Sequence, residues 1–251
     1  ANGEKAGGID ENKPSQPFGP ERNWSYELGV KQGFDDGRGL FDVALFYIDR
    51  SDLQTPVLDP TLLPRPDTVV VNVGTAHSVG VEAQLRYRLS EALSVNLGGT
   101  YTDAKFDSGI ISSFATFSGF APNGDISGQP MGRTSKLQLN GSLDFQAPLT
   151  DKVDWFWRLD GSYQSKQYMD PTALTTIPGR AIVNLRAGIE TGGFRIEAFA
   201  ENLFNEDSPT SAFRDVYFGN YDTGVARIFP YRVTLSYGRQ RLLGGRVTYR
   251  F

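Results

Sequence analysis

Few residues in this chain could carry catalytic or metal chemistry. His77 is the only histidine and there is no cysteine, so the sequence offers no histidine–cysteine metal cluster, and only His77 could activate a nucleophile. Asp35 and Asp36 are adjacent in a glycine-rich turn sequence, where Asx hydrogen bonding explains them better than acid–base catalysis. The acidic segment 201–207 lacks the spacing of a calcium-binding loop. We therefore predict no enzyme, no metal and no cofactor.

Aromatic and polar side chains gather in two segments that resemble loops, residues 110–123 and 212–221. Exposed aromatic rings with polar neighbours can stack on a sugar, a chelate or a flat organic ligand. Packing of each loop on itself explains the same composition equally well. The candidate substrate-binding residues are Phe114, Phe117, Phe120, Arg214, Tyr217, Phe218 and Tyr221.

Strands must position these loops, because apolar and polar residues alternate along most of the chain. In residues 79–89 the odd positions are apolar and the even positions hold Gly80, Glu82, Gln84, Arg86 and Arg88. A run of this length, tilted by about 45°, crosses an apolar layer of about 25 Å. The same alternation predicts further strands at residues 24–30, 41–47, 93–101, 137–145, 155–163, 181–189, 194–200 and 228–251. We read the last as one long strand with a kink near Gly238 or Gly244, which gives nine strands.

Composition favours an all-β chain and excludes some functions. The mean hydropathy is −0.34, and no segment approaches the ~18 consecutive apolar residues of a transmembrane helix. A β-barrel avoids this objection because only alternate residues meet lipid. The 28 Gly, 17 Phe and 11 Tyr suit turns and strands. The net charge of −4 gives no case for nucleic-acid binding.

A soluble β-sandwich is the alternative, because its strands also alternate. Two features favour a membrane barrel instead. The apolar faces repeatedly finish in aromatic residues, as lipid-facing strands do at the two membrane interfaces. Short turns also alternate with long connections, the usual arrangement in outer-membrane barrels. The short turns are residues 35–39, 90–92, 147–152 and 191–193, and the long connections are 52–76, 107–132, 166–178 and 205–227.

Four motifs carry a family resemblance. They are Tyr-Glu-Leu-Gly at 26–29, Gly-Val-Glu-Ala at 80–83, Asn-Leu-Phe-Asn at 202–205, and the terminal segment 238–251, which ends on Phe251. In this order, residues 23–251 resemble the C-terminal half of the barrel of a TonB-dependent outer-membrane receptor. One departure is Gln240-Arg241-Leu242, where the family usually has Pro-Arg-Thr before the final strand.

The resemblance implies an all-β fold, an antiparallel transmembrane β-barrel of about 22 strands closed by a plug, of which this chain supplies about nine. It implies a location in the bacterial outer membrane and uptake of a scarce nutrient, with a ferric siderophore or similar chelate as the favoured cargo. Haem, cobalamin and oligosaccharides remain open, as does a non-transporting structural or adhesive module. The implied partners are an N-terminal fragment with the plug and remaining strands, the TonB complex, outer-membrane lipid and the nutrient, with room for a surface lipoprotein.

The chain divides into an expected extracellular loop, residues 1–22, and the barrel part, residues 23–251. The first segment has no apolar core, so we expect neither a signal peptide nor a strand there. An odd number of strands cannot close an ordinary bacterial barrel. We therefore expect the chain to be the C-terminal piece of a longer precursor, with its missing strands supplied by another chain or fragment.

Two further sets of residues follow from the resemblance. Charged residues on the polar faces are expected to face the lumen, where contact with the plug and solvation are favoured over substrate recognition. These lumen-facing residues are Glu82, Arg86, Arg88, Arg158, Asp160, Arg186 and Glu197. The terminal aromatic residues Tyr249 and Phe251 resemble the signal that the barrel-assembly machinery reads.

The first prediction separates ligand binding from assembly. Replacing Phe114, Phe117, Tyr217 and Phe218 together by alanine should weaken ligand binding by several kcal/mol, since each buried aromatic can contribute about 1 kcal/mol. Deleting Phe251 should instead reduce insertion. The measurement is ligand affinity per inserted receptor for both variants. Normal binding by the loop variant would place the binding site elsewhere.

Overall fold

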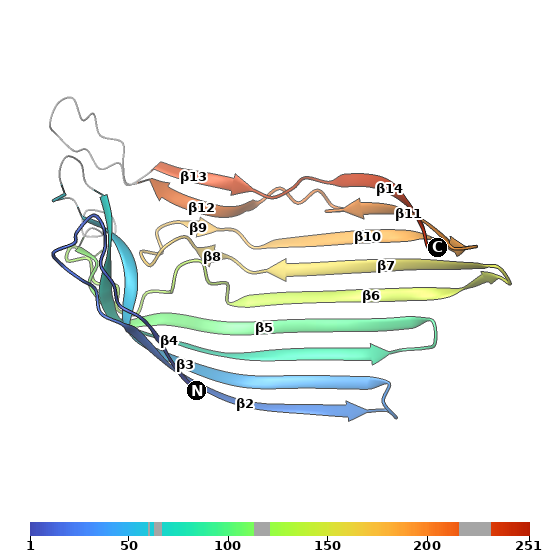
Figure 1. Ribbon diagram of the computed structural model, residues 1–251, viewed down its shortest axis with the longest axis horizontal. Coiled ribbons are helices and arrows are strands. Elements are labelled where there is room, and N and C mark those ends of the chain that lie inside the picture. Colours follow the sequence, from blue (N-terminus) through green and yellow to red (C-terminus); the bar gives the residue numbers. More distant parts are fainter. Residues whose placement is uncertain (60, 63–66, 113–120, 216–231) are drawn as a thin grey trace.

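The computed structural model of the chain is built around one open antiparallel sheet (Figure 1). It describes residues 1–59, 61–62, 67–112, 121–215 and 232–251. The sheet has ten strands in the order β1-β2-β3-β4-β5-β6-β7-β10-β11-β14, and two small sheets, β8-β9 and β12-β13, accompany it. Within the described residues, no helix is long and apolar enough to cross a membrane.

The strands of the main sheet confirm the all-β prediction. Eight of them, β2 to β7 together with β10 and β11, lie at predicted positions, and β14 lies within the ninth predicted segment, 228–251. Their bounds are β1 Asn2–Lys5, β2 Glu21–Phe34, β3 Gly39–Asp59, β4 Asp67–Arg88, β5 Leu93–Ser108, β6 Leu137–Thr150, β7 Val153–Gln164, β10 Arg180–Thr191, β11 Phe194–Glu201 and β14 Leu242–Tyr249. The small sheets comprise β8 Gln167–Tyr168, β9 Thr176–Ile177, β12 Pro209–Asp215 and β13 Arg232–Tyr237.

Short turns and long connections lie at opposite ends of the sheet (Figure 1). The β2-β3 turn places Asp35 and Asp36 at φ 54° and 50°, a conformation that Asp tolerates better than most residues. The β10-β11 turn uses Gly192 and Gly193, both at positive φ. The C-terminus lies at the short-turn end of the sheet. The predicted asymmetry of the connections is therefore present in the fold.

The alternation gives the sheet two chemically different sides, which we call the apolar face and the polar face. The apolar face exposes large side chains, with Leu28 75%, Leu97 51% and Leu243 66% accessible. No second layer covers this face in the described part of the chain. A soluble sandwich would bury these residues between two sheets, so the structure excludes the sandwich alternative.

Aromatic pairs mark the two ends of the apolar face. Near the short turns, Phe34 stacks on Tyr87 with ring centroids 5.5 Å apart. At the long-connection end, Trp24 and Tyr26 stack at 6.4 Å. Aromatic belts of this kind are typical of the two membrane interfaces of a barrel. Other pairs near the short turns are Phe145–Trp155, Phe145–Trp157 and Phe194–Tyr249.

The buried apolar core lies toward the long connections, and it corrects one predicted loop. Residues 52–76 were expected to be a long connection, but β3 continues to Asp59 and β4 begins at Asp67. This hairpin extension is ordered because its side chains pack with those of the β5-β6 connection. The cluster comprises Leu53, Val73, Ala76, Phe106, Ile111 and Ile126. Similarly, β8 and β9 lie within the connection 166–178, and β12 within 205–227.

Two other strand predictions were wrong. Residues 2–5 form β1, which pairs with the start of β2 through Asn2 and Trp24 and through Lys5 and Glu21. All four residues of β1 are exposed, so no apolar alternation announces the strand. The predicted single strand 228–251 is two strands, β13 and β14, which pair with different partners. The interruption falls at 238–241, beside one of the two predicted kinks; residues 228–231 lie outside the described part.

The rest of segment 1–22 packs against the β3-β4 extension. The Lys13 ammonium lies 2.7 Å from a carboxylate oxygen of Asp59, and the Asn12 side-chain amide donates to the Thr68 carbonyl. The Lys13 hydrogen bond, assisted by Thr61, lowers the pKa of the Asp59 carboxyl to about 2. These contacts hold the segment against the strands although it contributes no apolar core.

The second prediction tests which face meets lipid. Leu97→Arg puts a charge near the middle of the apolar face and should destabilise the protein by about 2–4 kcal/mol. Gln84→Arg, on the polar face of the neighbouring strand, should cost much less. The measurement is the unfolding free energy of each variant in a lipid bilayer. Equal losses would contradict the assignment of the faces.

Candidate functional site

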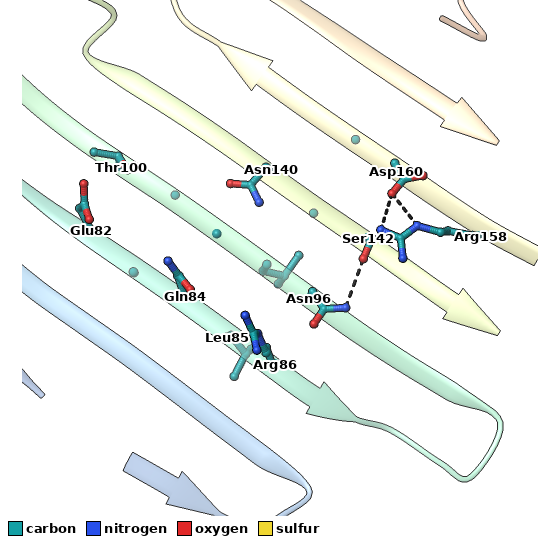
Figure 2. A pocket seen from close by; sticks show the side chains of 16 residues that line it. Glu82, Gln84, Leu85, Arg86, Asn96, Thr100, Asn140, Ser142, Arg158 and Asp160 are labelled. Atoms are coloured by element: carbon teal, nitrogen blue, oxygen red, sulfur yellow. Dashed lines mark hydrogen bonds and ion pairs between the residues drawn. The ribbon is translucent and has the colours of Figure 1, made fainter. Parts of the chain in front are cut away.

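The polar face contains a hollow of about 530 Å³ over β4 to β7 (Figure 2). Alternation on each strand points every second side chain into it. Of the predicted lumen-facing residues it gathers Glu82, Arg86, Arg158 and Asp160. Figure 2 also shows uncharged polar residues at the same hollow: Gln84 on β4, Asn96 and Thr100 on β5, and Asn140 and Ser142 on β6.

One side of the hollow is a continuous hydrogen-bonded chain. The Asn96 amide donates to the Ser142 hydroxyl at 3.2 Å, and this hydroxyl donates to Asp144 at 3.1 Å. The Arg158 guanidinium then donates to Asp144 at 2.6 Å and to Asp160 at 2.7 Å. Arg158 therefore pairs with both carboxylates within the sheet.

On the other side of the hollow, the polar side chains of β4 are not paired in this way. Among the described residues, the side chains of Glu82, Gln84 and Arg86 have no hydrogen-bond or ion-pair partner, and Figure 2 shows them at the hollow. The Asn140 side chain on β6 likewise has no hydrogen-bond partner in the described part of the chain. The hollow therefore presents a carboxylate, a guanidinium and two amides to a partner that is not part of the described sheet.

Glu197 lies in a second charged cluster near the short turns. Its side chain is 6% exposed and lies 3.2 Å from Arg195 Nε and 3.4 Å from Arg246 Nη1. The Arg195 guanidinium also lies over the ring of Phe156, 3.7 Å from its centroid. Burial of a carboxylate is costly unless it is paired, and the two arginines supply that pairing, so this cluster is a fixed part of the wall.

Of the remaining two predicted lumen-facing residues, Arg186 lies on β10, between the hollow and this cluster, and Arg88 is the last residue of β4. Arg186 Nη2 is 3.9 Å from Asp160 Oδ2, at the limit of an ion pair. Arg88 lines a neighbouring hollow together with Asp144 and Arg158. The structure thus brings the predicted set onto one wall, while their roles toward a plug or a substrate stay predictions.

The candidate binding loops are largely outside the described residues. Arg214 lies in β12. The residues outside the described part are Phe114, Phe117, Phe120, Tyr217, Phe218 and Tyr221.

His77 has a structural environment. Its Nδ1 lies 2.6 Å from an Asp107 carboxylate oxygen, and its ring stacks on Tyr47 with centroids 6.1 Å apart. Within the residues that the structure describes, no group of three or more histidine or acidic side chains could hold a metal ion.

The proposed assembly signal ends the sheet. The Tyr249 ring contacts Phe194 on β11 with centroids 4.6 Å apart and Phe251 at 5.1 Å. Phe251 itself is fully exposed. These positions leave the terminal ring accessible, and recognition by assembly machinery remains a prediction.

An open antiparallel sheet with one apolar and one polar face, belts of aromatic residues and long connections at one end is the architecture of a sector of an outer-membrane barrel. The chain matches the family described as TonB dependent receptor-like, beta-barrel, over residues 1–203. It therefore belongs to the TonB-dependent receptor β-barrel family of the bacterial outer membrane, whose members are transporters and not enzymes.

Solved receptors share the fold at low identity. The chain is similar to the ferric yersiniabactin uptake receptor FyuA from Yersinia pestis, with a TM-score of 0.73 and 19% identity over 98% of this chain and 33% of that one. It also resembles BauA, the ferric preacinetobactin receptor from Acinetobacter baumannii, with a TM-score of 0.62 and 20% identity over 98% and 32%. The ferric citrate transporter FecA gives 0.60 and 19% over 91% and 32%. The chain spans about a third of the length of these receptors.

Sequence reasoning placed Gln84 on the polar face without assigning it to a site, and it missed the other uncharged polar members of the hollow, Asn96, Thr100, Asn140 and Ser142. Their signal was present, because each alternates with the apolar residues of its strand and therefore lies on the opposite face. Only the cross-strand register shows that they meet, with Asn96 opposite Ser142 in the β5-β6 pair.

The third prediction tests whether the paired side of the hollow stabilises the wall. Arg158→Gln leaves Asp144 and Asp160 without their shared cation and should cost roughly 1–2 kcal/mol, because these groups are only partly buried. Arg133→Gln removes the same charge from an exposed position in the β5-β6 connection, where the side chain has no ion pair among the described residues, and should stay within about 0.5 kcal/mol. Unfolding free energies of both variants in detergent provide the comparison; an equal or larger loss for Arg133→Gln would contradict the assignment.

Proposed function

We propose that this chain is the C-terminal sector of the barrel of a receptor that takes up a ferric siderophore or a similar ferric chelate. The observation that carries the proposal is its membership of the TonB-dependent receptor family, together with solved receptors of the same fold that are named for ferric yersiniabactin, ferric preacinetobactin and ferric citrate. The full barrel would then contain further strands and a plug, and the TonB complex would energise transport.

The unpaired side of the hollow supports a partner inside the barrel. Glu82 and Arg86 lie four residues apart on β4, on one face of the strand, with Gln84 between them. Buried charges without partners are costly, so an occluded lumen requires complementary groups opposite them. A plug supplies such groups permanently, whereas a substrate would do so only during passage. We therefore assign this side of the hollow to plug contact.

The loops at the long-connection end are the proposed sites of chelate capture. Connecting segments carry the binding residues in many folds because a rigid scaffold holds them. Here the scaffold includes the buried cluster under the β3-β4 extension and a second cluster of Met169, Ile177 and Ala212, against which Val233 packs. Ordered bases of this kind would present the candidate aromatic residues to the outside of the cell.

The fourth prediction tests the cargo. Cells that depend on the full receptor should accumulate radiolabelled iron from at least one ferric siderophore or ferric citrate, and should lose uptake when TonB is absent. Cobalamin, haem and an oligosaccharide serve as competing substrates in the same cells. Uptake of one of these without any ferric chelate would overturn the cargo assignment. Surface adhesion without TonB-dependent uptake of any ligand would overturn the transport function.

A further inference from the structure

The strand β14 forms one free edge of the sheet (Figure 1). It pairs with β11 on one side only, from Leu242 opposite Glu201 to Tyr249 opposite Phe194. Its apolar face exposes Leu243 and Val247, each 66% accessible. A lipid-facing edge cannot leave its backbone groups unpaired. This step rests on the proposed function, in which another strand of the full barrel pairs with β14.

The polar face beside this edge carries a row of alternating charges. Glu190 and Arg195 are opposite each other on β10 and β11, and their charged groups are 2.5 Å apart. Arg195 contacts Glu197 two residues along β11, and Glu197 is opposite Arg246 on β14. Along this row two glutamates alternate with two arginines, and the last arginine, Arg246, lies on the edge strand.

Arg246 is held in place but is not saturated. Its guanidinium carbon lies 5.7 Å from the centroid of the Phe199 ring, and one nitrogen lies 3.4 Å from a Glu197 oxygen. A guanidinium has five N–H donors, and Glu197 is the only carboxylate that Arg246 contacts among the described residues. Glu197 is already shared with Arg195. The Arg246 side chain is 61% exposed, so most of its donors are available to a further acceptor.

We propose that the strand which pairs with the free edge of β14 carries an aspartate or glutamate on its polar face, directly opposite or diagonal to Arg246. Side chains at these positions on neighbouring strands are within reach of each other, and opposite charges there stabilise the pair. The charge row would then continue across the seam, and Arg246 would select the register in which that strand joins the sheet. A strand slipped by one residue would turn its carboxylate to the lipid side.

A carboxylate of the plug is the competing partner for Arg246, and zero-length cross-linking separates the two. In the full-length receptor, Arg246→Lys places a primary amine near the Arg246 charge. A carbodiimide activates a nearby carboxylate, and the amine displaces the urea to form an amide. Mass spectrometry should identify a cross-linked peptide from the barrel strand that adjoins β14, in addition to any link to Glu197. The matched control, Arg186→Lys in the interior of the sheet, should link to Asp160 and should give no link to the strand that adjoins β14.

Three results would overturn the inference: a link to Glu197 alone, a link to a plug peptide, or no link. A second measurement does not depend on cross-linking. In a Glu197→Gln background, Arg246→Gln should still lower the temperature at which the folded receptor converts to its slow-migrating form on a gel, because the seam pair is lost. No further decrease would show that Glu197 is the only partner. Iron uptake by the same variants tests the proposed function separately, since uptake with no seam link refutes only this inference.

Discussion

The structure depends on one constraint, that every backbone N–H and C=O in the apolar layer must find a partner in a neighbouring strand. The sheet meets it with long antiparallel ladders in which β2 and β3 pair from Phe34 and Gly39 up to Arg22 and Ser51. Where the ladder is interrupted, a side chain replaces it. The Asn202 amide, between β11 and β12, donates to the carbonyls of Glu206 and Arg239 at 2.8 and 3.1 Å. Through Asn202, the Asn-Leu-Phe-Asn motif therefore holds the two interruptions of the ladder, residues 202–208 and 238–241, next to each other.

The same constraint explains how a chain of low mean hydropathy can face lipid. Since the ladder satisfies the backbone, only the outward half of the side chains must be apolar. The inward half can carry charges, provided that they find partners. Around Arg158 and Glu197 these partners are in the sheet itself, whereas around Arg86 and beyond Arg246 they are not. The distribution of paired and unpaired charges therefore indicates where the wall is self-sufficient and where it requires other parts of the receptor.

The sequence predicted the strands along which apolar and polar residues alternate, and it missed the features that depend on which strands pair with each other. Residues 79–89 alternate without a fault, and they lie in or directly beside β4. Strand β1 has no such signal, because both its faces are exposed and only its hydrogen bonds to β2 define it. The break between β13 and β14 keeps the residue phase of one strand, so periodicity alone does not reveal it. In the site, phase placed Arg158 and Asp160 on one face, but the contact of Arg158 with Asp144 depends on the register between β6 and β7.

Phenylalanine on the polar face shows how closely register and composition are linked. Three such rings lie directly opposite glycines, in the pairs Phe46–Gly80, Phe156–Gly188 and Phe199–Gly244. A Cβ on any of these glycines would collide with the ring that covers it. Aromatic cover of a glycine restores packing where the backbone has no side chain of its own. In two of the three pairs an arginine then lies over the ring, Arg195 over Phe156 and Arg246 over Phe199. Each of these glycines therefore leaves the space that the opposite ring occupies. The ring in turn fixes the position of the guanidinium above it, so the glycines determine where the arginines of the charge row lie.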